Sequence, residues 1–479
     1  MRISVLLENL FDIANVQKTD FALAMNISPS SLSKILSGKT IPIEEEKNQF
    51  SRKASHFFAE NIYEEGCYIK FKNIFPVLYD FSSMYELKVF LIYAIDYALE
   101  NDYSFKKNTN LFEHNNRACS FIGRESVLNM TCIIISDYHR KNIDKHVEIN
   151  SSLRLFSQLY NDIFKHIKFN NTNDKNDEFG RLEFNHYFDM DTLEETHKNS
   201  DFCILEKIIN SKQKFNLNFY ETKLDKDSSF LLMKDTFLLL FNVLLDGTLI
   251  MTFINKDSYL SKFHNSLNNS NIKKISHSKE ETMSLLESNP KFLEELTKKL
   301  IEKIYSFLPV GFFVEKSDLD INFKNENIYN LINKIFDKIK NDDMDIYVST
   351  DMITDFLING KVIVPFIDTL DIEADKRIDY YTRSDKYLDD KNIHHIKIID
   401  SKLPKFVFLS YKDLSLLYLI DNDYKNEKVH IFKTNIFNEM IESRISNKNM
   451  HMIELNSVIR DTYLKNYSKK FFDISMESI

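Results

Sequence analysis

The pattern of apolar and polar positions near the start of the chain predicts a group of short helices. Apolar residues recur at helical spacing over 3–16, with acidic residues on the opposite face, which indicates a first amphipathic helix. A second helix is expected over 18–25, a third over 29–36, and a fourth begins near Pro42. This pattern predicts a small all-α bundle at the N-terminus.

The links between these helices carry residues suited to sharp turns and helix ends. Asn26 belongs to the few residue types besides glycine that tolerate a left-handed backbone. Ser28 is placed as an N-cap, and Pro29 stands at the first helical position, where a missing N–H costs nothing. Gly38 is available to cap the far end of the third helix. Two short helices joined by so short a turn predict a helix-turn-helix, whose second helix fits the major groove of DNA.

The charges around this motif agree with that geometry. The outer face of the third helix carries small hydroxyl side chains and Lys34. No Asp or Glu occurs from Phe21 to Ile43, although the chain holds 71 acidic residues, and Lys39 adds a second positive charge. A stretch without acidic residues suits contact with a polyanion.

The run from Asp20 to Lys39 resembles the lambda repressor/Cro type of helix-turn-helix, often called the XRE family. That family combines a leucine-alanine pair, a glycine at the turn, a valine-serine pair, an Ile-Ser-Arg segment and a Gly-Lys followed by Pro. The corresponding residues here, in the same order, are Phe21-Ala22, Asn26, Ile27-Ser28, Leu32-Ser33-Lys34, Gly38-Lys39 and Pro42.

The resemblance covers residues 1–66 and implies roles for individual side chains. It implies phosphate contacts from Lys18, Ser33 and Lys39, and the cap Ser28 is counted with the DNA-binding residues. It implies base reading by the residues on the outer face of the third helix: Pro29, Ser30, Ser31 and Lys34. The chain departs from the family pattern where Lys18 replaces Gln, Asn26 replaces Gly and Leu36 replaces an acid, so the DNA sequence that is read stays open.

The rest of the chain predicts a larger α+β body, so the protein is expected to have several domains. Beyond residue 180, short β-rich runs alternate with amphipathic helices. The expected division is a helix-turn-helix domain at 1–66, connecting helices and a polar linker at 67–118, a first α+β module at 119–340 and a second at 341–479. The linker itself is the Asn-rich stretch 101–118.

Particular elements of the body are also predicted. A second polar linker is expected over 170–178. Amphipathic spacing predicts three long helices, at 153–167, 292–307 and 453–467. The segments Phe230–Asp235 and Phe408–Asp413 echo each other, and each leads into an apolar stretch, a turn, a strand and a helix. Two related modules would produce this echo, and so would chance.

Composition narrows the class of protein. The chain has 479 residues, of which 43% are hydrophobic and 28% charged, and its net charge is −9. A protein that coats nucleic acid without specificity would be basic, so any DNA site must be a local patch. The four cysteines form no C-x-x-C pair, which favours reduced, mostly buried thiols in a cytoplasmic protein. The longest apolar stretch, Phe237–Leu245, is too short to span a bilayer, and no secretory signal is apparent.

The sequence offers no catalytic motif. Its seven glycines are scattered singly, so no phosphate-binding loop can be written. His394 and His395 are adjacent on an expected strand and would point to opposite faces, and the acidic runs at 342–345 and 389–390 are more typical of solvated loops than of cation sites. We therefore expect no catalytic residues, no metal and no cofactor. We expect that the protein is not an enzyme.

These patterns predict a transcription regulator that binds a two-fold site on double-stranded DNA through residues 18–42, as a homodimer. The body would supply dimerisation, and its size leaves room to sense a small-molecule or peptide effector. Two other classes stay open. An enzyme or anti-phage effector that carries the motif for autoregulation or targeting would need a catalytic site in the body. A protein-interaction scaffold that does not bind DNA would have its third helix covered or surrounded by acidic charge.

Overall fold

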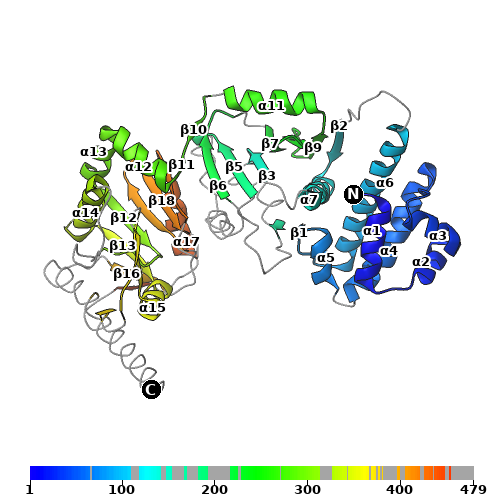
Figure 1. The fold of residues 1–479 in the computed structure, drawn as a ribbon, viewed down its shortest axis with the longest axis horizontal. Helices are drawn as coiled ribbons and strands as arrows, with labels where there is room; N and C mark the ends of the chain where they lie inside the picture. Colours follow the sequence, from blue (N-terminus) through cyan, green and yellow to red (C-terminus); the bar gives the residue numbers. More distant parts are fainter. Residues whose placement is uncertain are drawn as a thin grey trace, which may run out of the picture. The chain divides into compact units, whose positions relative to one another are not determined.

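The computed structural model describes residues 1–64, 67–108, 118–141, 147–153, 167–169, 182–191, 216–224, 228–269, 271–312, 326–341, 344–365, 368–373, 376–377, 380, 396–399, 405–420, 426–434, 436–447 and 452–454. The chain divides into two compact units (Figure 1). Unit 1 comprises Met1–Thr192 and Thr222–Ile272, and unit 2 comprises Leu193–Glu221 and Lys273–Ile479. The sequence predicts a division into four parts with other boundaries, and that division stays a prediction.

Four helices open unit 1. They are α1 (Ile3–Ala14), α2 (Lys18–Met25), α3 (Pro29–Leu36) and α4 (Lys47–Glu64), with one 3-10 turn, η1 (Glu44–Glu46), before α4. Their common core is aromatic: the Phe11 ring lies edge-on to Phe21 at 5.1 Å and to Phe58 at 5.2 Å between ring centroids. All three rings are buried. The first three helices lie where the sequence pattern predicts them.

The connecting region is more helical than the sequence indicates. It consists of α5 (Tyr68–Ile74), β1 (Val77–Tyr79) and α6 (Met84–Asn108). The expected linker at 101–118 is therefore wrong over 101–108. The polar residues Asp102 and Tyr103 are buried in this last part of α6 because both hydrogen-bond to backbone groups of the N-terminal residues. Residues 109–117 lie outside the described part of the chain.

A mixed sheet forms the rest of unit 1. Six strands stand in the order β5-β3-β7-β8-β9-β2, in which β3 and β5 are parallel and the other neighbours are antiparallel. A separate two-stranded pair joins β1 to β4 (Ile167–Phe169). The bounds of the remaining elements are β2 (Ala118–Ile122), α7 (Arg124–Lys141), β3 (Val147–Ser151), β5 (Leu182–Phe188), β7 (Ser228–Met233), β8 (Phe237–Val243), β9 (Leu249–Ile254) and α11 (Asp257–Asn269).

Unit 2 is built on an eight-stranded mixed sheet in the order β11-β19-β18-β17-β12-β13-β16-β20. Its first elements are β6 (Asn216–Glu221), β10 (Lys273–Lys274), β11 (Ser276–Ser278), α12 (Lys279–Ser288), α13 (Pro290–Lys298), β12 (Ile301–Ser306) and α14 (Glu326–Asn341). The later ones are β13 (Asp345–Ser349), α15 (Thr350–Asn359), β14 (Lys361–Val364), β15 (Asp368–Asp371), β16 (Ile396–Ile399), β17 (Val407–Tyr411), β18 (Ser415–Ile420), β19 (Glu427–Phe432), α17 (Ile436–Asn447) and β20 (Met452–Glu454).

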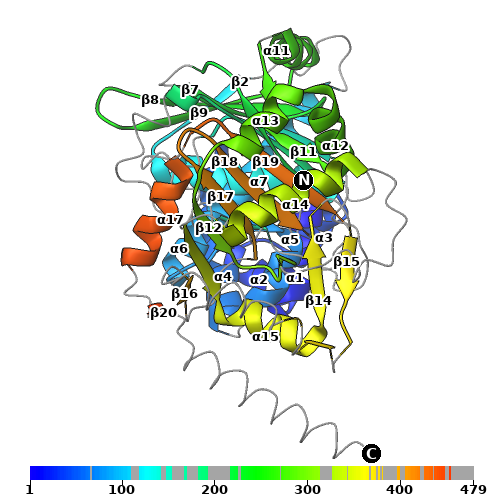
Figure 2. The ribbon, with the colours of Figure 1, turned by 90° about the vertical axis from the view of Figure 1, so that its left-hand side faces the viewer.

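Helices cover both faces of the unit 2 sheet. Ile304 of β12 belongs to the apolar core that α14 completes. The next residue, Tyr305, donates a hydrogen bond from its hydroxyl to Asn438 of α17 at 3.0 Å. Because successive strand residues point to opposite faces, α14 and α17 lie on opposite sides of the sheet (Figure 1). The hairpin of β14 and β15 lies beside α15 (Figure 2).

These elements confirm an α+β body and correct two predicted helices. The helix expected over 292–307 ends at Lys298, and 301–306 form the central strand β12, because pairing with strands on both sides outweighs the local periodicity. The helix expected over 453–467 is wrong at its start, where β20 pairs with β16. Several other predicted features lie outside the described residues: most of the 153–167 helix, the 170–178 linker, His394, His395, Asp342, Asp343, Cys203 and the acids at 389–390.

The two units share one order of strands. The order in unit 1 is β5-β3-β7-β8-β9-β2, and the equivalent order in unit 2 is β13-β12-β17-β18-β19-β11. Each pair of neighbouring strands is parallel or antiparallel in the same way in both units. The echoed segments Phe230–Asp235 and Phe408–Asp413 occupy equivalent places, on β7 and β17 with the adjoining turns. In each unit a helix follows the last of these strands in the chain: α11 follows β9 in unit 1, and α17 follows β19 in unit 2.

Candidate nucleic-acid interface

Helix α3 is fixed at both ends by its own sequence. The Ser28 hydroxyl accepts a hydrogen bond from the Ser31 backbone N–H at 3.1 Å, and Pro29 occupies the first turn. At the other end Gly38 adopts a φ of +71°, and the Lys39 N–H donates to the Lys34 carbonyl at 2.9 Å. These caps satisfy backbone groups that a helix of eight residues would otherwise leave unbonded.

The turn between α2 and α3 is as tight as the sequence predicts. Asn26 has φ 57° and ψ 42°, in the left-handed region, and its N–H bonds back to the end of α2. A second left-handed asparagine, Asn15, ends α1 at φ 50° and was not singled out from the sequence. Both turns let short helices change direction within a few residues.

The two faces of α3 differ sharply. Leu32 and Ile35 are buried, at 2% and 7% exposed, and hold the helix against the bundle. The residues assigned to DNA contact are all exposed: Lys18, Ser28, Pro29, Ser30, Ser31, Ser33, Lys34 and Lys39. All but Lys18 and Lys39 lie on α3 or at its cap, and Lys39 directly follows its C-terminal turn. The outer face of α3 is therefore uncovered.

Two of these hydroxyls are already engaged with each other. The Ser28 and Ser31 side chains lie 2.9 Å apart, so both contribute to the N-cap. The hydroxyl of Ser37, one residue past the helix, donates to the Lys34 carbonyl at 3.1 Å. Ser30 and Ser33 have no such bond among the described contacts, which leaves them as the hydroxyls most available to a ligand.

The lysines of this surface differ in their surroundings. Lys18 forms an ion pair with Glu8 of α1, with Nζ 2.7 Å from one carboxylate oxygen and 2.9 Å from the other. Neither Lys34 nor Lys39 makes an ion pair within the described residues. Along the chain after α2, acidic residues occur again only at η1, with Glu44–Glu46. Lys34 and Lys39 are thus ready to meet an anion, whereas Lys18 must first leave Glu8.

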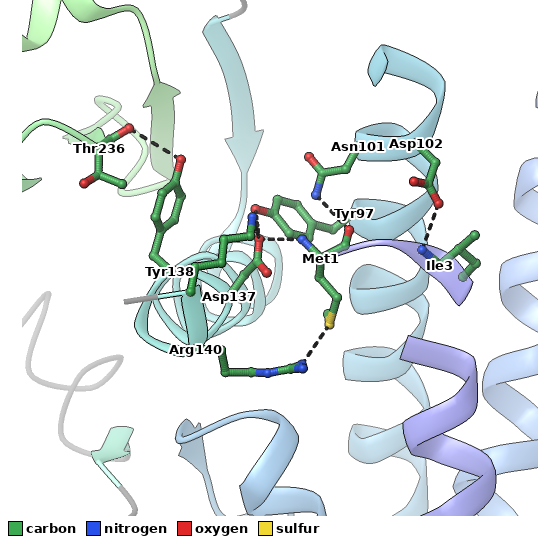
Figure 3. A network of polar contacts seen from close by, with 10 residues as sticks. Met1, Ile3, Tyr97, Asn101, Asp102, Asp137, Tyr138, Arg140 and Thr236 are labelled. Atoms are coloured by element: carbon green, nitrogen blue, oxygen red, sulfur yellow. Dashed lines mark hydrogen bonds and ion pairs between the residues drawn. The ribbon is translucent and has the colours of Figure 1, made fainter. Parts of the chain in front are cut away.

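The N-terminal bundle (α1–α4) is tied to α6 and α7 by buried polar contacts (Figure 3). The Asp102 carboxylate accepts from the Ile3 N–H at 2.9 Å, which caps the start of α1. Asp137 of α7, 3% exposed, accepts from the Met1 α-amino group at 2.6 Å and from the Tyr97 hydroxyl at 3.0 Å. Lys141 also contacts Asp137, at 2.8 Å. These contacts hold α1 against α6 and α7.

Ionisation of Asp137 maintains this junction. Burial alone would raise the pKa of its carboxyl group. The Met1 α-amino group and Lys141 outweigh burial and keep the Asp137 pKa below its ordinary value, while burial lowers the pKa of the Met1 α-amino group to about 6. Neither Asp102 nor Asp137 was singled out from the sequence. For Asp137 the sequence offers one signal, an acid two positions after the apolar run 132–135.

The described residues contain no group of three or more His, Cys, Asp or Glu side chains that could hold a metal ion. Among the same residues, no helix combines the length and apolarity that crossing a bilayer requires. Cys132 is buried, Cys67 is partly buried and Cys119 is exposed, so the expectation of mostly buried thiols fails for Cys119.

Comparisons with known proteins add little. No family model matches the chain, and no curated protein matches it. Among solved structures, the chain is similar to TrmBL2, an archaeal chromatin protein whose structure is described as showing a novel mode of DNA binding. The match has 14% identity, covers 36% of this chain and 62% of that chain, and has a TM-score of 0.20. A TM-score of this size does not establish a common fold.

Proposed function

We propose that the protein is a DNA-binding transcription regulator that reads DNA with α3, as a member of the lambda repressor/Cro (XRE) type. The observation that carries the proposal is the outer face of α3, an exposed polar surface without acidic residues on a helix capped at both ends. A helix of this size with small hydroxyl side chains can approach base edges in the major groove closely.

The side chains divide into two roles in this proposal. Ser30 and Lys34, with Pro29, face the bases, and Ser31 joins them when its hydroxyl exchanges its contact with Ser28 for one with DNA. Lys18, Ser33 and Lys39 flank them and contact phosphates, which fixes position without reading sequence. Ser28 acts mainly through its cap, since its hydroxyl is committed to the backbone of α3.

The remainder of the proposal concerns the body. We propose that the protein binds a two-fold DNA site as a homodimer, and that the α+β units outside the bundle provide dimerisation and the place where a small-molecule or peptide effector acts. An effector that favours one arrangement of the two bundles would change DNA affinity by its differential affinity for the two states.

The test is fluorescence anisotropy of the full chain against DNA from upstream of its own gene, at two salt concentrations. The Ser31→Glu/Lys34→Glu variant places negative charge on the reading face. A matched control, Ser258→Glu/Lys262→Glu, makes the same change of charge on two exposed residues of α11. We expect tight, salt-sensitive binding that only the α3 variant loses.

Other outcomes would redirect the assignment. Equal, weak binding by the wild type and both variants calls for selection from random DNA sequences. If that selection also recovers no preferred sequence, α3 does not read DNA and the bundle is an interaction module. Equal losses in the two variants would show that net charge, not the α3 face, governs binding.

A further inference from the structure

The shared strand order of the two units identifies equivalent strands that can be compared. Each unit contains a meander of three consecutive antiparallel strands, β7-β8-β9 in unit 1 and β17-β18-β19 in unit 2. A strand from earlier in the chain pairs antiparallel with the last strand of each meander: β2 with β9, and β11 with β19. β2 and β11 are therefore equivalent strands, and the sides that face away from β9 and β19 can be compared directly.

In unit 2, β6 contacts that other side at the start of β11, and it pairs antiparallel with β10, the short strand that precedes β11. The Ile275 N–H, just before β11, donates to the Phe219 carbonyl of β6 at 3.0 Å. The Phe219 N–H in turn donates to the Ser276 hydroxyl at 2.6 Å. In unit 1, β2 pairs with β9, and within the described residues no strand pairs with its other side. Among the residues that the structure describes, the side of β11 away from β19 has a neighbouring strand and the side of β2 away from β9 has none.

The backbone of β2 offers hydrogen bonds on this open side. Gly123, directly after β2, donates its N–H to the Leu249 carbonyl of β9 at 2.8 Å. Backbone groups in an antiparallel pair alternate in direction, so Phe121 also faces β9 with its N–H and C=O. The N–H and C=O groups of Ser120 and Ile122 then point away from β9 and toward the open edge.

The side chains of β2 lack the features that usually protect an open edge. Cys119, Ser120 and Ile122 are exposed, Ile122 at 62%, and the strand carries no charge and no proline. Natural edges are commonly short, charged or interrupted by proline. Two other strands at the ends of their strand orders fit that rule: β10 consists of two exposed lysines, and β20 has three residues and ends in Glu454.

We propose that β2 is the dimerisation edge of this protein and pairs antiparallel with β2 of a second copy. Two identical strands that meet antiparallel are related by a two-fold axis, which closes the assembly at two copies. The choice of a second copy as occupant rests on the proposed function, because a two-fold DNA site requires a two-fold protein. The pairing extends the sheet of each copy across the interface.

The test uses the full chain without DNA, so its outcome is independent of DNA binding. Sedimentation velocity should show the wild type as a dimer at micromolar concentration. Ser120→Pro removes an outward-facing N–H, and edge strands tolerate proline at such a position. Ile122→Lys places charge on the same edge. We expect each variant to raise the dimer dissociation constant by at least about tenfold. Ile358→Lys, at an exposed apolar residue of α15, is the matched control and should leave it unchanged.

Cross-linking supplies a second measurement. In a Cys119→Ser background, cysteine is introduced at Ser120 or at Phe121, near the middle of β2. In a two-fold pair of identical strands, the residue at the axis lies opposite the same residue of the second copy. Opposed Cα atoms about 4.5–5.5 Å apart lie within disulfide range, so one of these variants should form a disulfide-linked dimer under mild oxidation. The background without the added cysteine should not. A monomeric wild type, an open-ended assembly, or a dimer that persists in both edge variants would overturn the proposal.

Discussion

Releasing Lys18 from Glu8 should strengthen DNA binding. In the free protein the Lys18 ammonium contacts both carboxylate oxygens of Glu8, at 2.7 and 2.9 Å. A phosphate bound by Lys18 must compete with that carboxylate. In Glu8→Gln the competing charge is gone, and the lysine is free before DNA arrives.

The magnitude follows from the exposure of the pair. The Lys18 and Glu8 side chains are 52% and 40% exposed, so water screens their attraction strongly. Exposed pairs contribute about 0.2–1 kcal/mol, and at this exposure the lower half of that range applies. We therefore expect Glu8→Gln to tighten DNA binding by about 1.5- to 3-fold at low salt, with a smaller gain at high salt.

The assay is fluorescence anisotropy over a series of salt concentrations, run as a double-mutant cycle. Lys18→Gln should weaken binding and lower the slope of log affinity against log salt by about 0.9, the loss of one phosphate contact. Once Lys18 is removed, Glu8→Gln should have little further effect. Asp12→Asn is the control, since it makes the same change of charge at an exposed residue of α1 that does not pair with Lys18.

Two results would refute this reasoning. If Asp12→Asn tightens binding as much as Glu8→Gln, the gain comes from net charge and not from release of Lys18. If Glu8→Gln strengthens binding equally with and without Lys18, the ion pair does not compete with DNA.

Three further predictions concern stability. Asp102→Ala removes the acceptor that caps α1 and should lower the free energy of unfolding by about 1–3 kcal/mol; urea unfolding measures it, and an unchanged midpoint would contradict the role of this contact. Gly360→Ala should destabilise unit 2 by at least about 1–3 kcal/mol, because φ is +68° and an added Cβ would lie 2.3 Å from the Ile372 carbonyl oxygen; a melting temperature equal to the wild type's would show the opposite. Burial lowers the pKa of His186 from 6.5 to about 3 and outweighs the Ser151 backbone, which raises it. The contribution of His186 to stability is therefore complete above pH 6.5 and declines as the pH falls toward 3. His186→Gln should flatten stability against pH across that window, and a dependence as steep as the wild type's would assign it to other groups.

Local signals made the N-terminal bundle predictable from sequence. Asn26 at the turn, Ser28 at the cap and Gly38 at the helix end each act within four residues of their own position. The exposed face of α3 followed because its buried positions, Leu32 and Ile35, already fix its orientation. The candidate DNA surface needed no long-range information.

Features that depend on distant partners could not be predicted in this way. The polar end of α6 has the composition of a linker, yet Asp102 is ordered by Ile3, which lies 99 positions earlier in the chain. The residues of β12 continue the helical pattern of α13 and become a strand because partners from 345–348 and 407–411 flank them. The open edge of β2 is recognisable only by comparison with β11, after both sheets are known.

The shared strand order also has a consequence for how the chain folds during synthesis. In each unit the first strand of the shared order to be synthesised, β2 or β11, waits for its partner, β9 or β19. Ser120 lies 132 positions before Thr252, and Ser276 lies 154 positions before His430. At about 5–20 residues per second, β11 stays without its partner for about 8 to 30 seconds. The meanders themselves can form early, since their contacts are local. A nascent chain therefore holds incomplete sheets for seconds, and molecular chaperones that bind extended apolar segments should have most effect on its yield in that interval.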